Sequence, residues 1–149
     1  MKKLLTILML SISLISYGQT KKNKTVEIGK FGTISADYRC EMTDKSNFTY
    51  VSLIFQNAKY THITDSGIIL FRDSTSIMDF SEALIQASSS IKNNSEWDIG
   101  RYVISTPTFI NKVMVSIKKG GEYTYLSKKK SIELGETLKR YHKLGNIKK

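Results

Sequence analysis

The chain has 149 residues, of which 23 are basic and 13 acidic, so its formal net charge is +10. This length suffices for one domain with a sizeable core. The single cysteine, Cys40, excludes an intramolecular disulfide and a zinc site of the usual cysteine type. We expect Cys40 to be a small buried apolar residue, with a disulfide to a second chain as the alternative.

Residues 1–18 have the parts of a secretory signal peptide. Lys2 and Lys3 form a basic n-region, an apolar run follows, and small residues precede a predicted cut between Gly18 and Gln19. The apolar run is shorter than the about 20 residues that span a bilayer, so an uncleaved anchor is the less favoured alternative. This leader resembles those of exported proteins from Bacteroidetes-type bacteria. We therefore expect a periplasmic or extracellular protein with no transmembrane span in its mature chain.

Cleavage would remove two lysines and leave 21 basic and 13 acidic residues, a net charge of +8. Residues 19–24 predict a flexible lead-in, and residues 25–145 predict a single domain, with candidate halves at 25–92 and 96–145. The positive charge favours anionic partners such as a polysaccharide, lipid headgroups or nucleic acid. Simple solubility is the alternative explanation of this charge.

The first half is expected to contain about four strands and one helix. The strand patterns cover Thr25–Cys40, with a bend or hairpin at its glycines, Phe48–Gln56, Lys59–Thr64 and Ile68–Phe71. Residues 41–47 are expected to form a polar loop. The following helix is expected to start near Asp79, because Asp79 and Glu82 have the spacing of a helix start. Its apolar face is a stripe at helical spacing: Phe80, Leu84, Ala87 and Ile91.

The second half is expected to contain three strands and one helix. The strand patterns cover Trp97–Ser105, Ile110–Lys118 and Glu122–Leu126, and Gly120 with Gly121 predicts a hairpin between the last two. The final helix is expected over Ser131–Leu144, capped by Ser131 and stopped by Gly145. Its apolar stripe is Leu134, Leu138 and Tyr141.

The two helical patterns coincide when Asp79 is placed on Glu133. Either one strand–helix unit was duplicated, or two independent units on one sheet share a common design. Both readings predict an α+β fold, with antiparallel sheets of about seven strands and two amphipathic helices. Four antiparallel strands and a helix, given twice, resemble the Whirly-like arrangement, including PUR repeats. That resemblance implies curved sheets packed around helices and, as in several members, binding of single-stranded nucleic acid. It carries no site residues over to this chain.

The residues provide no catalytic set, since His62 and His142 each stand alone in the sequence. They also provide no phosphate-binding glycine loop, and we expect neither a metal nor a cofactor. The prediction is therefore an exported, non-enzymatic binding or interaction module, whose partner is an anionic molecule or another protein.

The alternative is a protein that binds polyanions or single-stranded nucleic acid through a basic, tyrosine-containing sheet face. Such sites combine cations that follow phosphates with aromatic rings that stack on bases. The candidate residues come from two adjacent strands and the segment that follows them: Lys112, Lys118, Tyr123, Tyr125, Lys128, Lys129 and Lys130. Half-buried tyrosines beside a solvated lysine edge would give the same pattern without any binding.

Overall fold

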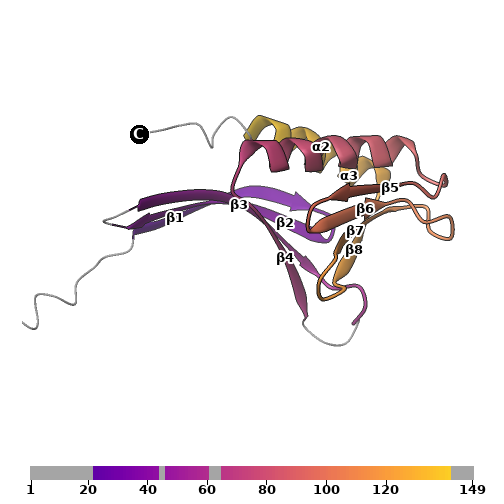
Figure 1. The fold of residues 1–149 in the computed structure, drawn as a ribbon, viewed down its shortest axis with the longest axis horizontal. Helices are drawn as coiled ribbons and strands as arrows, with labels where there is room; N and C mark the ends of the chain where they lie inside the picture. The colour runs from indigo at the N-terminus through magenta and orange to yellow at the C-terminus, as the bar shows by residue number, and fades with distance from the viewer. Residues whose placement is uncertain (1–21, 44–45, 61–64, 142–149) are drawn as a thin grey trace, which may run out of the picture.

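The computed structural model describes residues 22–43, 46–60 and 65–141 and shows an α+β fold, which confirms the predicted class (Figure 1). The first sheet is antiparallel and has the strand order β1 (Lys22–Phe31), β2 (Ile34–Thr43), β3 (Ser46–Gln56) and β4 (Ser66–Phe71). Helix α2 (Ser74–Ser89) follows it. The second antiparallel sheet has the order β5 (Glu96–Ile99), β6 (Tyr102–Ser105), β7 (Val113–Ile117) and β8 (Tyr123–Leu126). Helix α3 (Lys128–Tyr141) follows that sheet, so four strands and a helix occur twice.

The expectation of about seven strands was one too low. The segment Trp97–Ser105, expected as one strand, is a hairpin of β5 and β6 that turns at Gly100 and Arg101. Gly100 has a φ of 60°, and two-residue hairpin turns favour such left-handed backbone because it matches strand twist. The second half therefore has the fourth strand that its pattern does not predict.

The expected polar loop at 41–47 is also wrong, because β2 and β3 continue their pairing out to Thr43 and Ser46. A backbone ladder needs no apolar alternation to form, so the polar composition was misleading there. Lys59 and Tyr60 of the expected strand Lys59–Thr64 lie outside any strand, and the rest of it falls outside the described residues.

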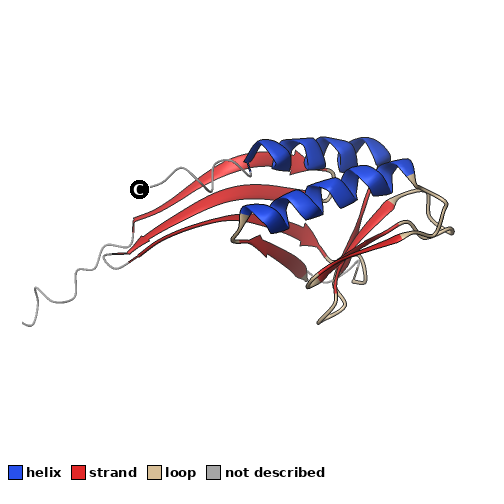
Figure 2. Cartoon of the chain, turned by 45° about the horizontal axis from the view of Figure 1, so that its top comes forward, coloured by secondary structure: helices blue, strands red, loops and turns tan. Residues whose placement is uncertain are grey.

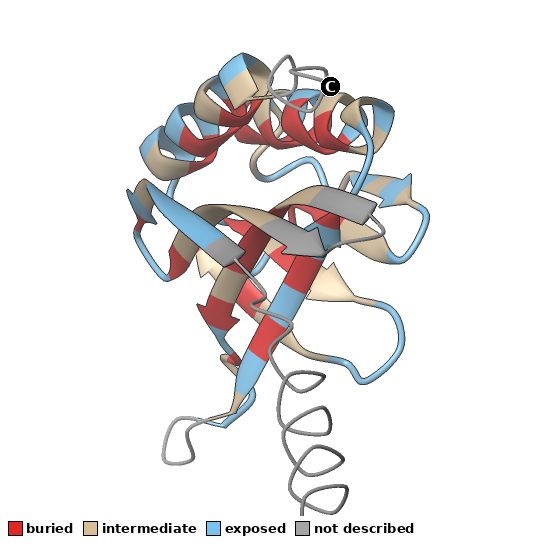
Figure 3. Ribbon diagram, turned by 90° about the vertical axis from the view of Figure 1, so that its left-hand side faces the viewer, coloured by how far each residue is buried: buried red, intermediate tan, exposed pale blue. Residues whose placement is uncertain are grey.

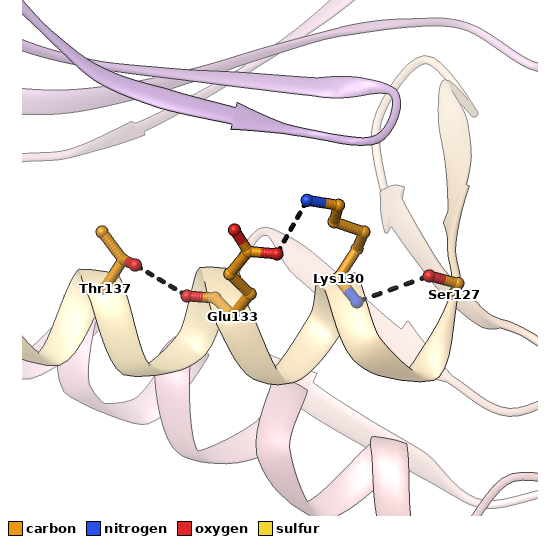
Figure 4. A network of polar contacts seen from close by, with 4 residues as sticks. All are labelled: Ser127, Lys130, Glu133 and Thr137. Carbon is orange, nitrogen blue, oxygen red and sulfur yellow. Dashed lines mark hydrogen bonds and ion pairs between the residues drawn. The ribbon is translucent and has the colours of Figure 1, made fainter.

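Both helices begin earlier than expected, and neither Asp79 nor Ser131 is a cap. The carboxylate of Asp73 accepts the backbone N–H of Ser76 at 2.7 Å and its hydroxyl at 2.8 Å. At the second helix, the hydroxyl of Ser127 accepts the backbone N–H of Lys130 at 3.4 Å (Figure 4). The two caps are 54 residues apart, which is also the offset between Asp79 and Glu133. The helix starts therefore coincide in the two halves.

The helices lie side by side and cover the inner faces of both sheets (Figure 2). Phe80, Leu84, Ala87, Leu134 and Leu138 are each 0% exposed, which confirms these positions of the predicted stripes. Ile91 of the first stripe lies beyond the end of α2, and Tyr141 of the second is half-buried. Figure 3 shows the buried sides of the helices turned toward buried stretches of the strands. One core therefore holds the two strand–helix units together.

A glycine allows the two helices to approach closely. A methyl group at Gly135 would lie 2.9 Å from the carbonyl oxygen of Ser81 and 2.8 Å from Cγ1 of Ile85. No larger residue fits there without a shift of the helices, so Gly135 sets their spacing.

Polar contacts join the two sheets at their edges. The amide N–H of Ala58, after β3, donates to the carbonyl oxygen of Tyr123 in β8 at 2.7 Å. On the other side, the hydroxyl of Tyr102 in β6 meets the backbone of Leu70 in β4. Within the described ranges, neither helix is long and apolar enough to cross a membrane.

Candidate functional site

An open groove of about 1050 Å³ lies between α2, the end of β4 and the β5–β6 hairpin. Strands β4 and β5 are edge strands of their respective sheets, and residues of both line the groove. Edge strands present backbone N–H and C=O groups that can pair with another chain. The groove is therefore lined by one edge strand from each sheet.

On the unpaired side of β4, the backbone of Leu70 is hydrogen-bonded to Tyr102, whereas among the described residues no such contact covers the backbone of Ile68. The N–H of Leu70 donates to the hydroxyl oxygen of Tyr102 at 3.2 Å, and that hydroxyl lies 3.3 Å from the carbonyl oxygen of Leu70. Residues two apart in a strand direct their backbone groups to the same side. Ile68 therefore directs its own N–H and C=O toward the groove as well.

Apolar side chains line the β4 side of the groove. Strand β4 alternates strictly between exposed and buried residues, with Ile69 and Phe71 in the core. Ile68 and Leu70 point the other way and are 53% and 41% exposed. Across the groove, half-buried Trp97 donates its indole N–H to Oε1 of Gln86 at 3.0 Å. This pairing fixes the indole ring against α2.

The groove is acidic although the chain is basic. Its lining contains five carboxylates and two guanidinium groups: Asp73, Asp79, Glu82, Glu96 and Asp98, with Arg72 and Arg101. Hydrogen bonds from the backbone and then the side chain of Ser76 hold the pKa of Asp73 below its usual value of 3.8. Asp98 forms an ion pair with Lys118. Within the described part of the chain, Asp79, Glu82 and Glu96 form no ion pair. Three carboxylates thus remain available to a cationic ligand.

The lysines of the predicted basic sheet face fall into two groups in the structure, those with an ion pair to a carboxylate of the chain and those that extend from its surface. Lys112 and Lys118 lie just beyond the two ends of β7, and both are exposed. Lys118 is neutralised by Asp98, and Lys130 by Glu133 at 2.7 Å (Figure 4). Two of the five predicted lysines therefore already have an anionic partner in the chain.

The two predicted tyrosines are adjacent on the outer face of β8. The rings of Tyr123 and Tyr125 are half-buried and pack edge to face, with centroids 5.5 Å apart. Burial, and next the proximity of Tyr123, raises the pKa of Tyr125. These rings pack against each other and are less exposed than Lys112, Lys128 and Lys129 nearby in the chain.

The start of β7 pairs with the end of β8, at Val113 and Leu126. This pairing brings Lys112, which precedes β7, close to the start of α3 at Lys128 and Lys129, and all three lysines are exposed. The loop that leads into Lys112 carries Phe109, which is 80% exposed. We call Phe109, Lys112, Lys128 and Lys129 the basic end. Sequence reasoning missed Phe109, whose only signal was an aromatic residue two positions after the single proline.

The other sequence candidates contribute little to a site. Cys40 on β2 is half-buried rather than buried, and its thiol is free. His62 and His142 lie outside the described residues. Over those described ranges, no group of three or more His, Cys, Asp or Glu side chains is placed to hold a metal ion.

Comparison with known proteins does not supply an assignment. No protein-family model matches the chain, and no curated protein matches it significantly. The groove and the basic end are therefore the two surfaces from which we infer a function.

Proposed function

We propose that the protein is an exported, non-enzymatic interaction module whose groove binds a cationic and apolar segment of a partner protein. The leader pattern of residues 1–18 supports export. The observation that carries the proposal is the combination of exposed Ile68 and Leu70 with three carboxylates that lack an ion pair.

Each part of the groove supplies a different component of recognition. The apolar side of β4 offers area whose burial favours binding at about 25 cal/mol per Å² before the costs of association. The carboxylates of Asp79, Glu82 and Glu96 select Lys or Arg over acidic residues and speed encounter with a cationic segment. The backbone of Ile68 adds hydrogen-bonding groups that an incoming peptide can pair with.

The single tryptophan gives a direct measurement, because Trp97 lines the groove. Its emission should change saturably when a short peptide of alternating Lys and Phe is added, and the affinity should fall as salt is raised. A peptide with Glu in place of Lys should leave the emission unchanged.

Charge reversals locate the binding. Asp79→Lys with Glu82→Lys should weaken peptide binding by about tenfold or more, because attraction becomes repulsion in the groove. Glu136→Lys is the matched control, since Glu136 is an exposed helix carboxylate that does not line the groove. Equal affinity of the Lys and Glu peptides, or equal effects of the two sets of variants, would contradict the proposal.

A second candidate function is binding of a polyanion or a single-stranded nucleic acid at the basic end. The exposure of Phe109 and of the three lysines of the basic end favours it, because an aromatic ring can stack on a base while lysines contact phosphates. The order of four strands and a helix, given twice, supports the resemblance to the Whirly-like arrangement.

This candidate is tested by titrating a thymidine oligonucleotide at several salt concentrations. Three phosphate contacts predict a slope of about −2 in log affinity against log salt for a single strand. Lys128→Ala with Lys129→Ala should reduce both affinity and slope, whereas Lys118→Ala should not, because Lys118 is paired with Asp98. Salt-independent binding would rule this candidate out.

A further inference from the structure

We propose that the segment bound in the groove is the β6–β7 loop of a second copy of this chain, so that copies join head to tail. This inference rests on the proposed function of the groove and names its partner. The loop spans Thr106 to Lys112, between β6 and β7.

The loop and the groove are complementary in apolar surface. Among the described residues, the two most exposed large hydrophobic side chains are Phe109 at 80% and Ile68 at 53%. Phe109 lies on a connecting loop, and Ile68 lines the groove. Docking one copy on another would bury both, and large aromatic side chains are frequent anchors of protein interfaces.

The two surfaces are also complementary in charge. In the basic end, Lys112 belongs to the same loop as Phe109, and Lys128 and Lys129 begin α3 at the adjoining end of β8. All four residues are exposed. The groove offers Asp79, Glu82 and Glu96 without an ion pair in the described part of the chain. The groove therefore has an excess of negative charge, even with Arg72 and Arg101 in its lining, and the basic end has an excess of positive charge. Long-range attraction between them favours this orientation over others.

The loop is held in shape before any contact. Thr106 donates its N–H to the carbonyl oxygen of Ser95 at 2.9 Å, and its hydroxyl accepts the N–H of Ser95 at 3.1 Å. The N–H of Ile110 donates to the carbonyl oxygen of Pro107 at 3.2 Å, and Thr106 and Pro107 are both buried. An anchored loop loses little conformational freedom when it binds, so it presents Phe109 at a low entropic cost.

The groove and the loop share no residue, so the contact uses two different surfaces of the same chain. Such a contact is heterologous, and after the first association the pair keeps a free loop on one copy and a free groove on the other. Assembly therefore continues into a ring or a filament rather than stopping at a symmetric dimer.

The test is sedimentation velocity of residues 19–149 at low salt over about a hundredfold range of concentration. The wild-type chain should form species that grow with concentration and dissociate as salt is added. Phe109→Ser should remain a monomer, and so should Ile68→Ser combined with Glu82→Lys. Val26→Ser, at an exposed apolar position on β1 outside both surfaces, and Glu136→Lys are controls that should assemble like the wild type.

Mixing the two defective variants is decisive. The Phe109 variant keeps an intact groove and the groove variant keeps an intact loop, so an equimolar mixture should give dimers and nothing larger. Circular dichroism of each variant verifies that it is folded.

A wild-type chain that stays monomeric, a mixture that stays monomeric, or a mixture that forms larger species would each overturn head-to-tail assembly. The Trp97 titration tests peptide binding in the groove independently of head-to-tail assembly. If the chain is monomeric but the Lys and Phe peptide still changes the Trp97 emission, the groove function stands and only the identity of the partner is wrong.

Discussion

Asp73 serves both the start of α2 and the lining of the groove. Its replacement by alanine removes the acceptor for Ser76 and should lower the free energy of unfolding by about 1 kcal/mol, the usual value of a helix N-cap. Asp73→Asn keeps an acceptor and should cost less. Urea unfolding at neutral pH measures both variants.

The pH dependence follows from the direction of the pKa shift. The pKa of Asp73 is lowered in the folded chain, so its charge stabilises the fold above the ordinary value of 3.8 and this stabilisation is lost as pH falls through the folded pKa. The advantage of the wild type over Asp73→Asn should therefore shrink below pH 3.8. An advantage that stays constant down to pH 2 would show that the charge of Asp73 has no part in it.

The close contact between the two helices at Gly135 leads to a second prediction for a single residue. Gly135→Ala should destabilise the fold by about 1–3 kcal/mol, although alanine is the better helix former, because its methyl group meets Ser81 and Ile85. Glu136→Ala, at an exposed neighbouring position, should be neutral within about 0.5 kcal/mol. Thermal unfolding of both variants distinguishes the tight helix contact from a general effect on α3.

At the scale of elements, the apolar stripes could be predicted because helical periodicity directly reflects burial. Phe80 and Leu134 fall on those stripes, and both are fully buried. The starts of the two helices could not be predicted, because Asp73 and Ser127 precede polar segments that resemble turns. The β5–β6 turn was missed since Gly100 stands between residues of strand type. The groove depends on which strands lie at sheet edges, and local patterns do not reveal strand order.

Tyr102 links the two strand–helix units through β4. Tyr102→Phe removes both contacts with the backbone of Leu70 and should lower the free energy of unfolding by about 1 kcal/mol. It should also open the edge of β4 and speed hydrogen exchange at the amide of Leu70. Tyr60→Phe, at an exposed position, is the control. Unchanged exchange at Leu70 would mean that Tyr102 does not close this edge.

At the scale of the whole molecule, opposite charges are separated onto different surfaces. The groove is lined by five carboxylates, whereas the basic end contains three exposed lysines and exposed Phe109. The net charge of +10 conceals this separation, because a sum carries no positions. A role of the predicted basic residues in binding stays a prediction. The acidic groove could not be predicted from the sequence, because it forms only when α2, β4 and β5 are brought together.

The most direct test of the groove is the change in backbone amide chemical shifts when the Lys and Phe peptide is added to the uniformly ¹⁵N-labelled chain. We expect the largest changes at Ile68, Leu70, Glu82 and Trp97, which line the groove. Changes concentrated on Lys112, Lys128 and Lys129, or no changes at saturating peptide, would contradict this expectation.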